Sequence, residues 1–190
     1  MTRDARIASA TVALAAVCAA LQASGLVPYL RYDRVAIGNG EIWRLITGHL
    51  VHLGAGHLAV NVAGLALVAL LVGRYLSLRA WGATLLVCCL ATSGGLWALS
   101  PGLRWYVGLS GVLHGLLVAG AARAAREGPE RRFNALVLAI VAAKLAWEQF
   151  AGPMPGTSRL AGGSVIVDAH LFGALGGLAA AGMLLTRRRR

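Results

Sequence analysis

Three polar side chains that could carry out acyl transfer occur inside apolar stretches of this 190-residue chain. They are Ser110, within the run GLSGVLHG, and the histidines His57 and His170. A serine hydroxyl is a weak nucleophile, and a neutral imidazole beside it can take its proton. Gly108 and Gly111 flank the serine, which suits a tight entry into a helix and lets a substrate backbone come close. These residues predict a serine-dependent acyl transfer.

The elements that must position them are membrane helices. The chain is 58% hydrophobic and 13% charged, with a mean hydropathy of +0.70, whereas soluble domains average about 25% charged residues. Apolar runs near the length of about 20 residues that crosses a bilayer lie at about 7–27, 54–73, 81–100, 105–122, 133–150 and 165–185. We therefore expect an all-α polytopic membrane protein with a six-helix core, forming a single domain over residues 1–190.

The distribution of basic residues predicts the orientation. Twelve arginines lie at the N-terminus, in two alternate gaps and in the tail at 186–190, against five in the other gaps. Cytoplasmic loops are enriched in Lys and Arg, so both termini should be cytoplasmic. The first loop, about 28–53, is then on the outer side, and its aromatic and apolar residues predict an interfacial position. Because the net charge of +11 comes from these short gaps, it does not indicate nucleic-acid binding.

Depth counting places the polar residues in one layer. The second, fourth and sixth helices all run inward, and His57, Ser110 and His170 each lie about 5–8 Å below the outer end of their helix at 1.5 Å per residue. Asn61 is one turn below His57. The fourth and sixth helices also carry small residues at four-residue spacing, which lets membrane helices approach closely. We expect Ser110 and His170 to come within hydrogen-bond reach.

The same layer could stabilise the oxyanion of a tetrahedral intermediate, with the Ser110 backbone N–H, Asn61 and His57 as donors. Asp168 is two residues before His170 and therefore on another helical face, so a Ser–His dyad is expected. Lys144 and Glu148, four residues apart in the fifth helix, are most simply an ion pair.

The spacing of the histidines and cysteines does not indicate a metal site. The run HLVHLGAGH matches no common metal-site spacing. The three cysteines lie in apolar runs and are most simply buried side chains. We expect neither a metal nor another cofactor.

Four short motifs resemble the rhomboid family of intramembrane serine proteases over about residues 41 to 180. They are Trp43-Arg44 in the first loop, His57-x-x-x-Asn61, Gly108-Leu109-Ser110-Gly111 and Ala169-His170-x-x-Gly173. The resemblance implies Ser110 as nucleophile, His170 as base, and His57 and Asn61 as oxyanion donors. Where most rhomboids carry a tyrosine four residues after the serine, this chain has His114, which could pack on His170 or form a hydrogen bond near the site.

The chain also resembles the rhombosortase branch, through EIWRLITGHLVHLGAGHLAVN, GLSGVLHGLL, KLAWEQ and VDAHLFGALGG. This implies a protease of the bacterial inner membrane whose active site opens to the outer, periplasmic side. Its substrates would be secreted proteins with a C-terminal tail made of a Gly-Gly-type motif, a transmembrane helix and a basic cluster. Glu148, toward the outer end of its helix, could contact substrate or gate its entry.

Other functions stay open on the sequence. The protein could be a general rhomboid protease for single-pass membrane proteins, or an inactive rhomboid-like protein that binds membrane clients. A small transporter fits less well, because the polar groups gather at the outer end and not at mid-membrane. The sequence also leaves open whether the acyl-enzyme passes to water or to an amine acceptor.

Overall fold

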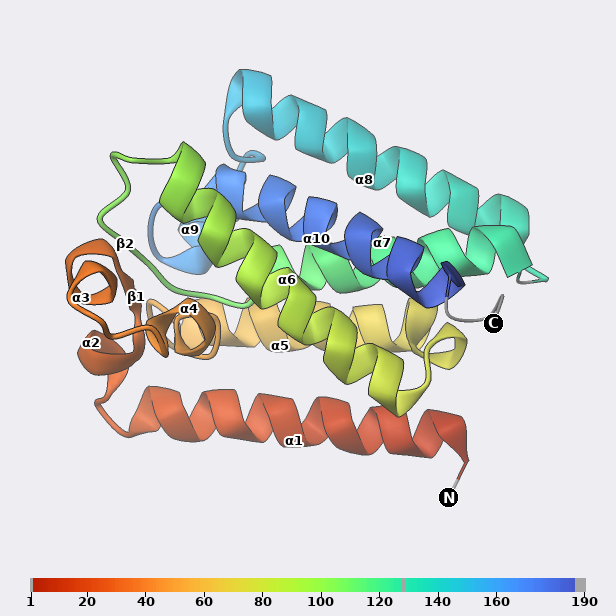
Figure 1. Ribbon diagram of the computed structural model, residues 1–190, viewed down its shortest axis with the longest axis horizontal. Coiled ribbons are helices and arrows are strands. Elements are labelled where there is room, and N and C mark those ends of the chain that lie inside the picture. Colours follow the sequence, from red (N-terminus) through yellow and green to blue (C-terminus); the bar gives the residue numbers. More distant parts are fainter. Residues whose placement is uncertain (1, 128, 187–190) are drawn as a thin grey trace.

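The computed structural model describes residues 2–127 and 129–186, and within them the fold is a bundle of long helices with short elements gathered at one end (Figure 1). The long helices are α1 (Arg3–Ala23), α5 (Ala55–Val72, followed by the 3₁₀ turn η1, Gly73–Tyr75), α6 (Leu78–Leu99), α7 (Ser110–Glu127), α8 (Arg131–Ala151) and α10 (Val167–Thr186). The short elements are α2 (Val27–Leu30), β1 (Tyr32–Asp33), α3 (Arg34–Gly38), α4 (Arg44–Thr47), β2 (Trp105–Tyr106) and α9 (Thr157–Ala161).

Within the described residues, five helices are long and apolar enough to cross a membrane: α1, α5 with η1, α6, α8 and α10. The sixth segment of the predicted core, α7, carries three charged residues near its end: Arg123, Arg126 and Glu127. It is the central helix of the bundle and packs against α5, α6, α8 and α10. The chain is thus a helical membrane protein in which the predicted count of six spanning helices rests on α7.

Two helix starts differ from the hydropathy pattern. The pattern predicts a first helix from residue 7, but α1 begins at Arg3 because the Thr2 hydroxyl accepts from the Ala5 N–H at 3.2 Å and caps the helix. The pattern also predicts that Trp105 and Tyr106 begin the fourth helix. They instead form β2, which pairs antiparallel with β1. Ser110 is therefore the first residue of α7, and its predicted depth of about 5–8 Å within the helix is wrong.

The first loop forms a folded cap on one end of the bundle. The guanidinium of Arg44 is buried and donates to the Pro28 and Arg31 carbonyls, both at 3.0 Å, while pairing with Glu41 at 2.7 Å. Its neighbour Trp43 is half exposed, in keeping with a position at a lipid surface. Arg44 thus holds together the segment that leads into α5, and neither residue of this predicted motif touches the serine.

Helices α7 and α10 pack backbone to backbone, as their small residues predict. A side chain on Gly173 would collide with the Gly111 backbone, and one on Gly111 would come 2.5 Å from the Ala169 carbonyl oxygen. The Gly residues therefore set the separation of the two helices. This contact brings the start of α7 against the start of α10.

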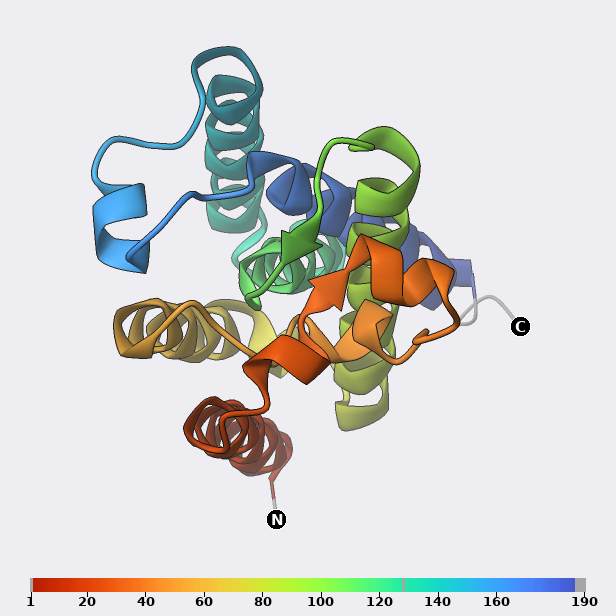
Figure 2. The same ribbon diagram turned by 90° about the vertical axis from the view of Figure 1, so that its left-hand side faces the viewer.

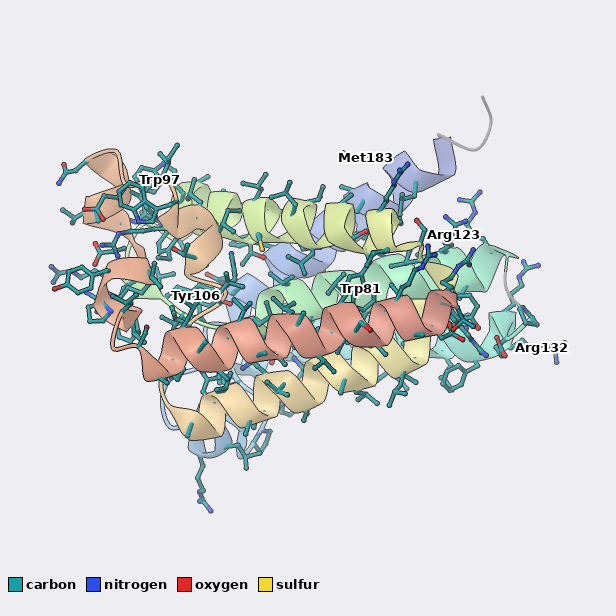
Figure 3. All side chains as sticks on the ribbon, turned by 90° about the horizontal axis from the view of Figure 1, so that it is seen from below. Trp81, Trp97, Tyr106, Arg123, Arg132 and Met183 are labelled. Carbon is teal, nitrogen blue, oxygen red and sulfur yellow. The ribbon has the colours of Figure 1, made fainter. Side chains whose placement is uncertain are left out.

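The start of α1 and the end of α10 lie at the end of the bundle opposite the first loop (Figure 1). Arg123 and Arg132 lie at that same end, whereas Trp97 and Tyr106 lie at the loop end (Figure 3). Arg123 and Arg132, two of the twelve basic residues predicted to be cytoplasmic, thus lie at the end opposite the first loop. Residues 187–190 of the predicted basic tail lie outside the described residues.

Candidate active site

Ser110 and His170 meet where α7 and α10 begin. The Ser110 Oγ lies 3.0 Å from His170 Nε2. Ser110 follows a turn at Gly108, whose φ of +118° is one that side chains rarely tolerate. His170 is in the first turn of α10 and is 5% exposed. The predicted approach of these two side chains is present, with the geometry of a nucleophile and its base.

The other imidazole nitrogen of His170 faces an acid. Its Nδ1 lies 2.9 Å from Glu148 Oε2, and the second oxygen of that carboxylate lies 2.7 Å from Lys144 Nζ. Because a carboxylate accepts, Nδ1 carries the proton and Nε2 is left free to accept the Ser110 hydroxyl proton. The three side chains from α7, α10 and α8 thus form a Ser–His–Glu chain in place of the expected dyad.

Glu148 is 2% exposed and also lines the cavity beside Ser110, so its contact with substrate or role as a gate stays a prediction. The predicted Lys144–Glu148 ion pair is present. Asp168, the acid nearest to His170 in sequence, accepts instead from the Ser100 hydroxyl at 2.6 Å. The sequence signal for Glu148 is its helical spacing to Lys144. This spacing predicts the ion pair with Lys144 but not the contact with His170, which lies on another helix.

His57 lies beside the turn that precedes the serine. Its Nδ1 accepts from the Leu53 N–H at 3.2 Å, so the proton of the neutral ring is on Nε2. A Cβ on Gly108 would lie 2.9 Å from this nitrogen. Because Gly108 has no side chain, the His57 ring can lie against it. His57 Nε2–H is thus a donor close to the backbone that precedes Ser110.

Asn61 is buried one turn further along α5. Its Nδ2 donates to the His57 carbonyl at 2.9 Å, which fixes the orientation of the amide because a carbonyl can only accept. The amide group has a second N–H, and Asn61 lines the same cavity as Ser110. Together with the Ser110 N–H at the start of α7, these donors could surround an oxyanion.

His114 occupies both positions considered for it. Its ring is stacked on that of His170, with centroids 4.3 Å apart and planes inclined by 21°. Its Nδ1 lies 2.8 Å from the Ser110 carbonyl oxygen and must donate to it. His114 therefore holds the His170 ring against the first turn of α7.

A cavity of about 860 Å³ opens beside these groups. Its walls come from α5, β2, α7, α8, α9 and the start of α10, and most of the lining is apolar. Figure 2 shows α5 and α8 standing apart on one side of the molecule with α9 beside them. The nucleophile is thus reached from a space between helices that is large enough for a segment of polypeptide.

Metal ligation is geometrically conceivable at one place in the described chain, where potential ligand atoms of His114, Glu148 and His170 lie within 4.8 Å of one another. Glu148 already pairs with Lys144 and His170, and His114 Nδ1 is held by the Ser110 carbonyl. A cation would have to displace these contacts. The arrangement favours proton transfer over metal binding.

His49 and His52, the histidines of the first loop, are buried and do not line the cavity beside the serine. His49 Nε2 lies 2.9 Å from Ser93 Oγ and 3.1 Å from the Cys89 carbonyl, and His52 packs edge-on against the His57 ring. Burial lowers the pKa of each of the two imidazoles to about 4. Both are therefore neutral packing residues at neutral pH.

Comparison with known proteins places this geometry in a family. The sequence model of the Rhomboid domain family matches residues 39–187, which include every long helix except α1. A search of curated proteins found no match. The match covers most of the chain and both the serine and the histidine helices. The chain therefore belongs to the rhomboid family of intramembrane serine proteases.

Proposed function

We propose that this protein is a serine endopeptidase in which Ser110 is the nucleophile and His170 is the general base. Glu148 orients the His170 ring and stabilises its protonated form. The observation that carries the proposal is the continuous chain of contacts, 3.0 Å from Ser110 Oγ to His170 Nε2 and 2.9 Å from His170 Nδ1 to Glu148. Three different helices supply these groups, so their alignment requires the tertiary fold.

The reaction follows from the contacts. His170 Nε2 takes the hydroxyl proton as Ser110 Oγ attacks the scissile carbonyl, and the Glu148 carboxylate stabilises the imidazolium that forms. The Ser110 N–H, His57 Nε2–H and Asn61 Nδ2–H are the donors for the oxyanion. His170 then returns the proton to the leaving amine, and a second nucleophile, water or an amine, releases the acyl group.

For the substrate, we propose the C-terminal sorting tail of secreted proteins, with a Gly-Gly-type motif, a transmembrane helix and a basic cluster. The cavity between α5 and α8 supports access for a membrane-embedded segment. We also propose that the protein lies in a bacterial inner membrane with both termini cytoplasmic, so that the site opens outward. The separation of Arg123 and Arg132 from the first loop supports this orientation (Figure 3).

The test is co-expression with a secreted reporter carrying such a tail, followed by mass spectrometry of the reporter's new C-terminus. Wild-type protein should cut near the glycines, and the Ser110→Ala and His170→Ala proteins should insert normally without cutting. Processing by Ser110→Ala would exclude the proposed nucleophile. Equal cutting of a single-pass reporter without glycines would favour a general rhomboid protease, and no Ser110-dependent cutting of any reporter would favour a client-binding protein.

A further inference from the structure

Helix α8 contributes only charged side chains to the cavity beside the serine. Lys144 and Glu148 line it, and on the same face of α8 Val141 and Leu145 are buried in a cluster with Val118 and Ala174. Glu148 is almost completely buried, but 30% of the Lys144 side chain is exposed. The ammonium group therefore faces the space through which a substrate reaches Ser110.

Lys144 has more hydrogen-bond donors than the site uses. An ammonium group has three N–H donors and no acceptor, and Glu148 Oε1 takes one of them at 2.7 Å. His170 Nδ1 is 3.5 Å away, but it carries the proton donated to Glu148 and so cannot accept. Within residues 2–127 and 129–186, no other acceptor contacts Nζ, which leaves two donors for a group that enters the cavity.

A cation with unused donors is costly inside a membrane segment, where polar groups are usually functional. The occupant that would satisfy it is an unwound polypeptide. A helix must open to bring a peptide bond to Ser110, and each carbonyl freed in this way costs several kcal/mol in an apolar surrounding unless it finds a donor. The cavity wall is mostly apolar, so the donors of Lys144 match what such a segment lacks.

We propose that Lys144 is a substrate-recognition residue whose ammonium group donates hydrogen bonds to main-chain carbonyl oxygens of the unwound substrate segment next to the scissile bond. The inference rests on the proposed protease function and names the chemistry that its substrate must present. It favours segments with residues of low helix propensity, such as glycine, because these expose their carbonyls at the lowest cost.

The alternative is that Lys144 only holds Glu148 in place. The two roles differ in what they change, because a small serine-directed reagent needs the Ser–His–Glu chain but does not fill the cavity. We would measure the rate at which a fluorophosphonate labels Ser110, and the KM and kcat for a synthetic polypeptide with a Gly-Gly segment, a 20-residue Leu/Ala helix and an Arg tail. The full-length protein in detergent micelles would be compared as wild type and Lys144→Met, with Ile140→Met, at an exposed position of α8 that does not line the cavity, as the control.

Lys144→Met should raise KM about tenfold or more, as expected for losing hydrogen bonds from a charged donor, while Ser110 labelling stays within about threefold of wild type. Ile140→Met should change neither by more than about twofold. Replacing amides near the scissile bond by esters, whose carbonyls accept more weakly, should raise KM for wild type and have less effect on Lys144→Met.

Two results would overturn the inference while leaving the protease intact. One is an unchanged KM for Lys144→Met, and the other is a loss of substrate cleavage matched by an equal loss of Ser110 labelling, which would make Lys144 a positioning residue for Glu148. Failure of the proposed function looks different, because wild-type protein would then show no labelling at Ser110 and no Ser110-dependent cleavage.

Discussion

Replacing Glu148 by glutamine tests whether its carboxylate acts on His170. Glutamine keeps an oxygen that can accept from His170 Nδ1, but it removes the charge 2.9 Å from the ring nitrogen. At an effective dielectric constant of about 20, unit charges at this separation attract by about 6 kcal/mol. Part of this attraction is replaced by solvent and neighbouring dipoles, and hydrogen bonds to charged groups contribute about 1.5–3 kcal/mol net.

Such a loss corresponds to a fall of about 10–100-fold in kcat, at 1.36 kcal/mol for each factor of ten. The assay is cleavage of a tailed reporter by purified Glu148→Gln protein, together with the rate of fluorophosphonate labelling, and both should fall by a similar factor. The substitution also leaves the Lys144 ammonium unpaired near His170. The double variant Lys144→Met/Glu148→Gln removes that charge and should remain slow.

Combining Glu148→Gln with His170→Ala should slow fluorophosphonate labelling no further than His170→Ala alone, because the carboxylate acts through the imidazole. Thermal unfolding in detergent would serve as the control for folding. A Glu148→Gln protein that folds and cleaves within about twofold of wild type would refute the role assigned to the acid. A further slowing of labelling in the double variant with His170→Ala would do the same.

Contacts of Asn61, Gly173 and His49 each have a measurable consequence. Asn61→Ala should lower kcat by about 100-fold with little change in KM, as for the loss of one oxyanion donor, and an unchanged kcat in steady-state cleavage would remove Asn61 from the oxyanion site. Gly173→Ala should lower the free energy of unfolding in detergent by about 1–3 kcal/mol because its methyl group meets the Gly111 backbone, whereas Gly182→Ala, which has open space beside it, should not. The pKa of His49 is about 4 in the folded protein and about 6.5 in the unfolded protein. The unfolded state therefore binds the extra proton, so the stability of the protein is full above pH 6.5 and falls by about 3 kcal/mol towards pH 4. His49→Gln should lose this part of the pH dependence in thermal melts, and His52, whose pKa is shifted in the same direction, should account for a similar part.

Hydropathy and small-residue spacing anticipated much of the helical framework. Both signals are local, since a span needs a run of apolar residues and close packing needs glycines four apart. The contact between Ser110 and His170 could therefore be predicted from the sequence. The small-residue stripe through Gly111 and the helix face with His170 and Gly173 belong to the two helices that pack most closely. The residue at which α7 starts could not be predicted in this way, because Trp105 pairs with Asp33, a residue 72 positions earlier.

Glu148 shows where local reasoning fails. Its spacing to Lys144 explains a charge inside a helix without any further partner, and nothing in residues 131–151 points to His170. The distance between Glu148 and His170 depends on how α8 packs against α10, which requires the tertiary structure. The position of His114 could be predicted only in part. Its place on the helix face of Ser110 follows from i, i+4 spacing, whereas the stacking of its ring on His170 does not.

The most direct measurement of the central claim is the site of covalent modification by a fluorophosphonate, located by mass spectrometry of the digested protein. We expect a single adduct on the peptide that contains Ser110, lost in Ser110→Ala and slowed by orders of magnitude in His170→Ala. An adduct on another residue, or one that persists at the same rate in His170→Ala, would contradict the assignment of Ser110 as a nucleophile activated by His170.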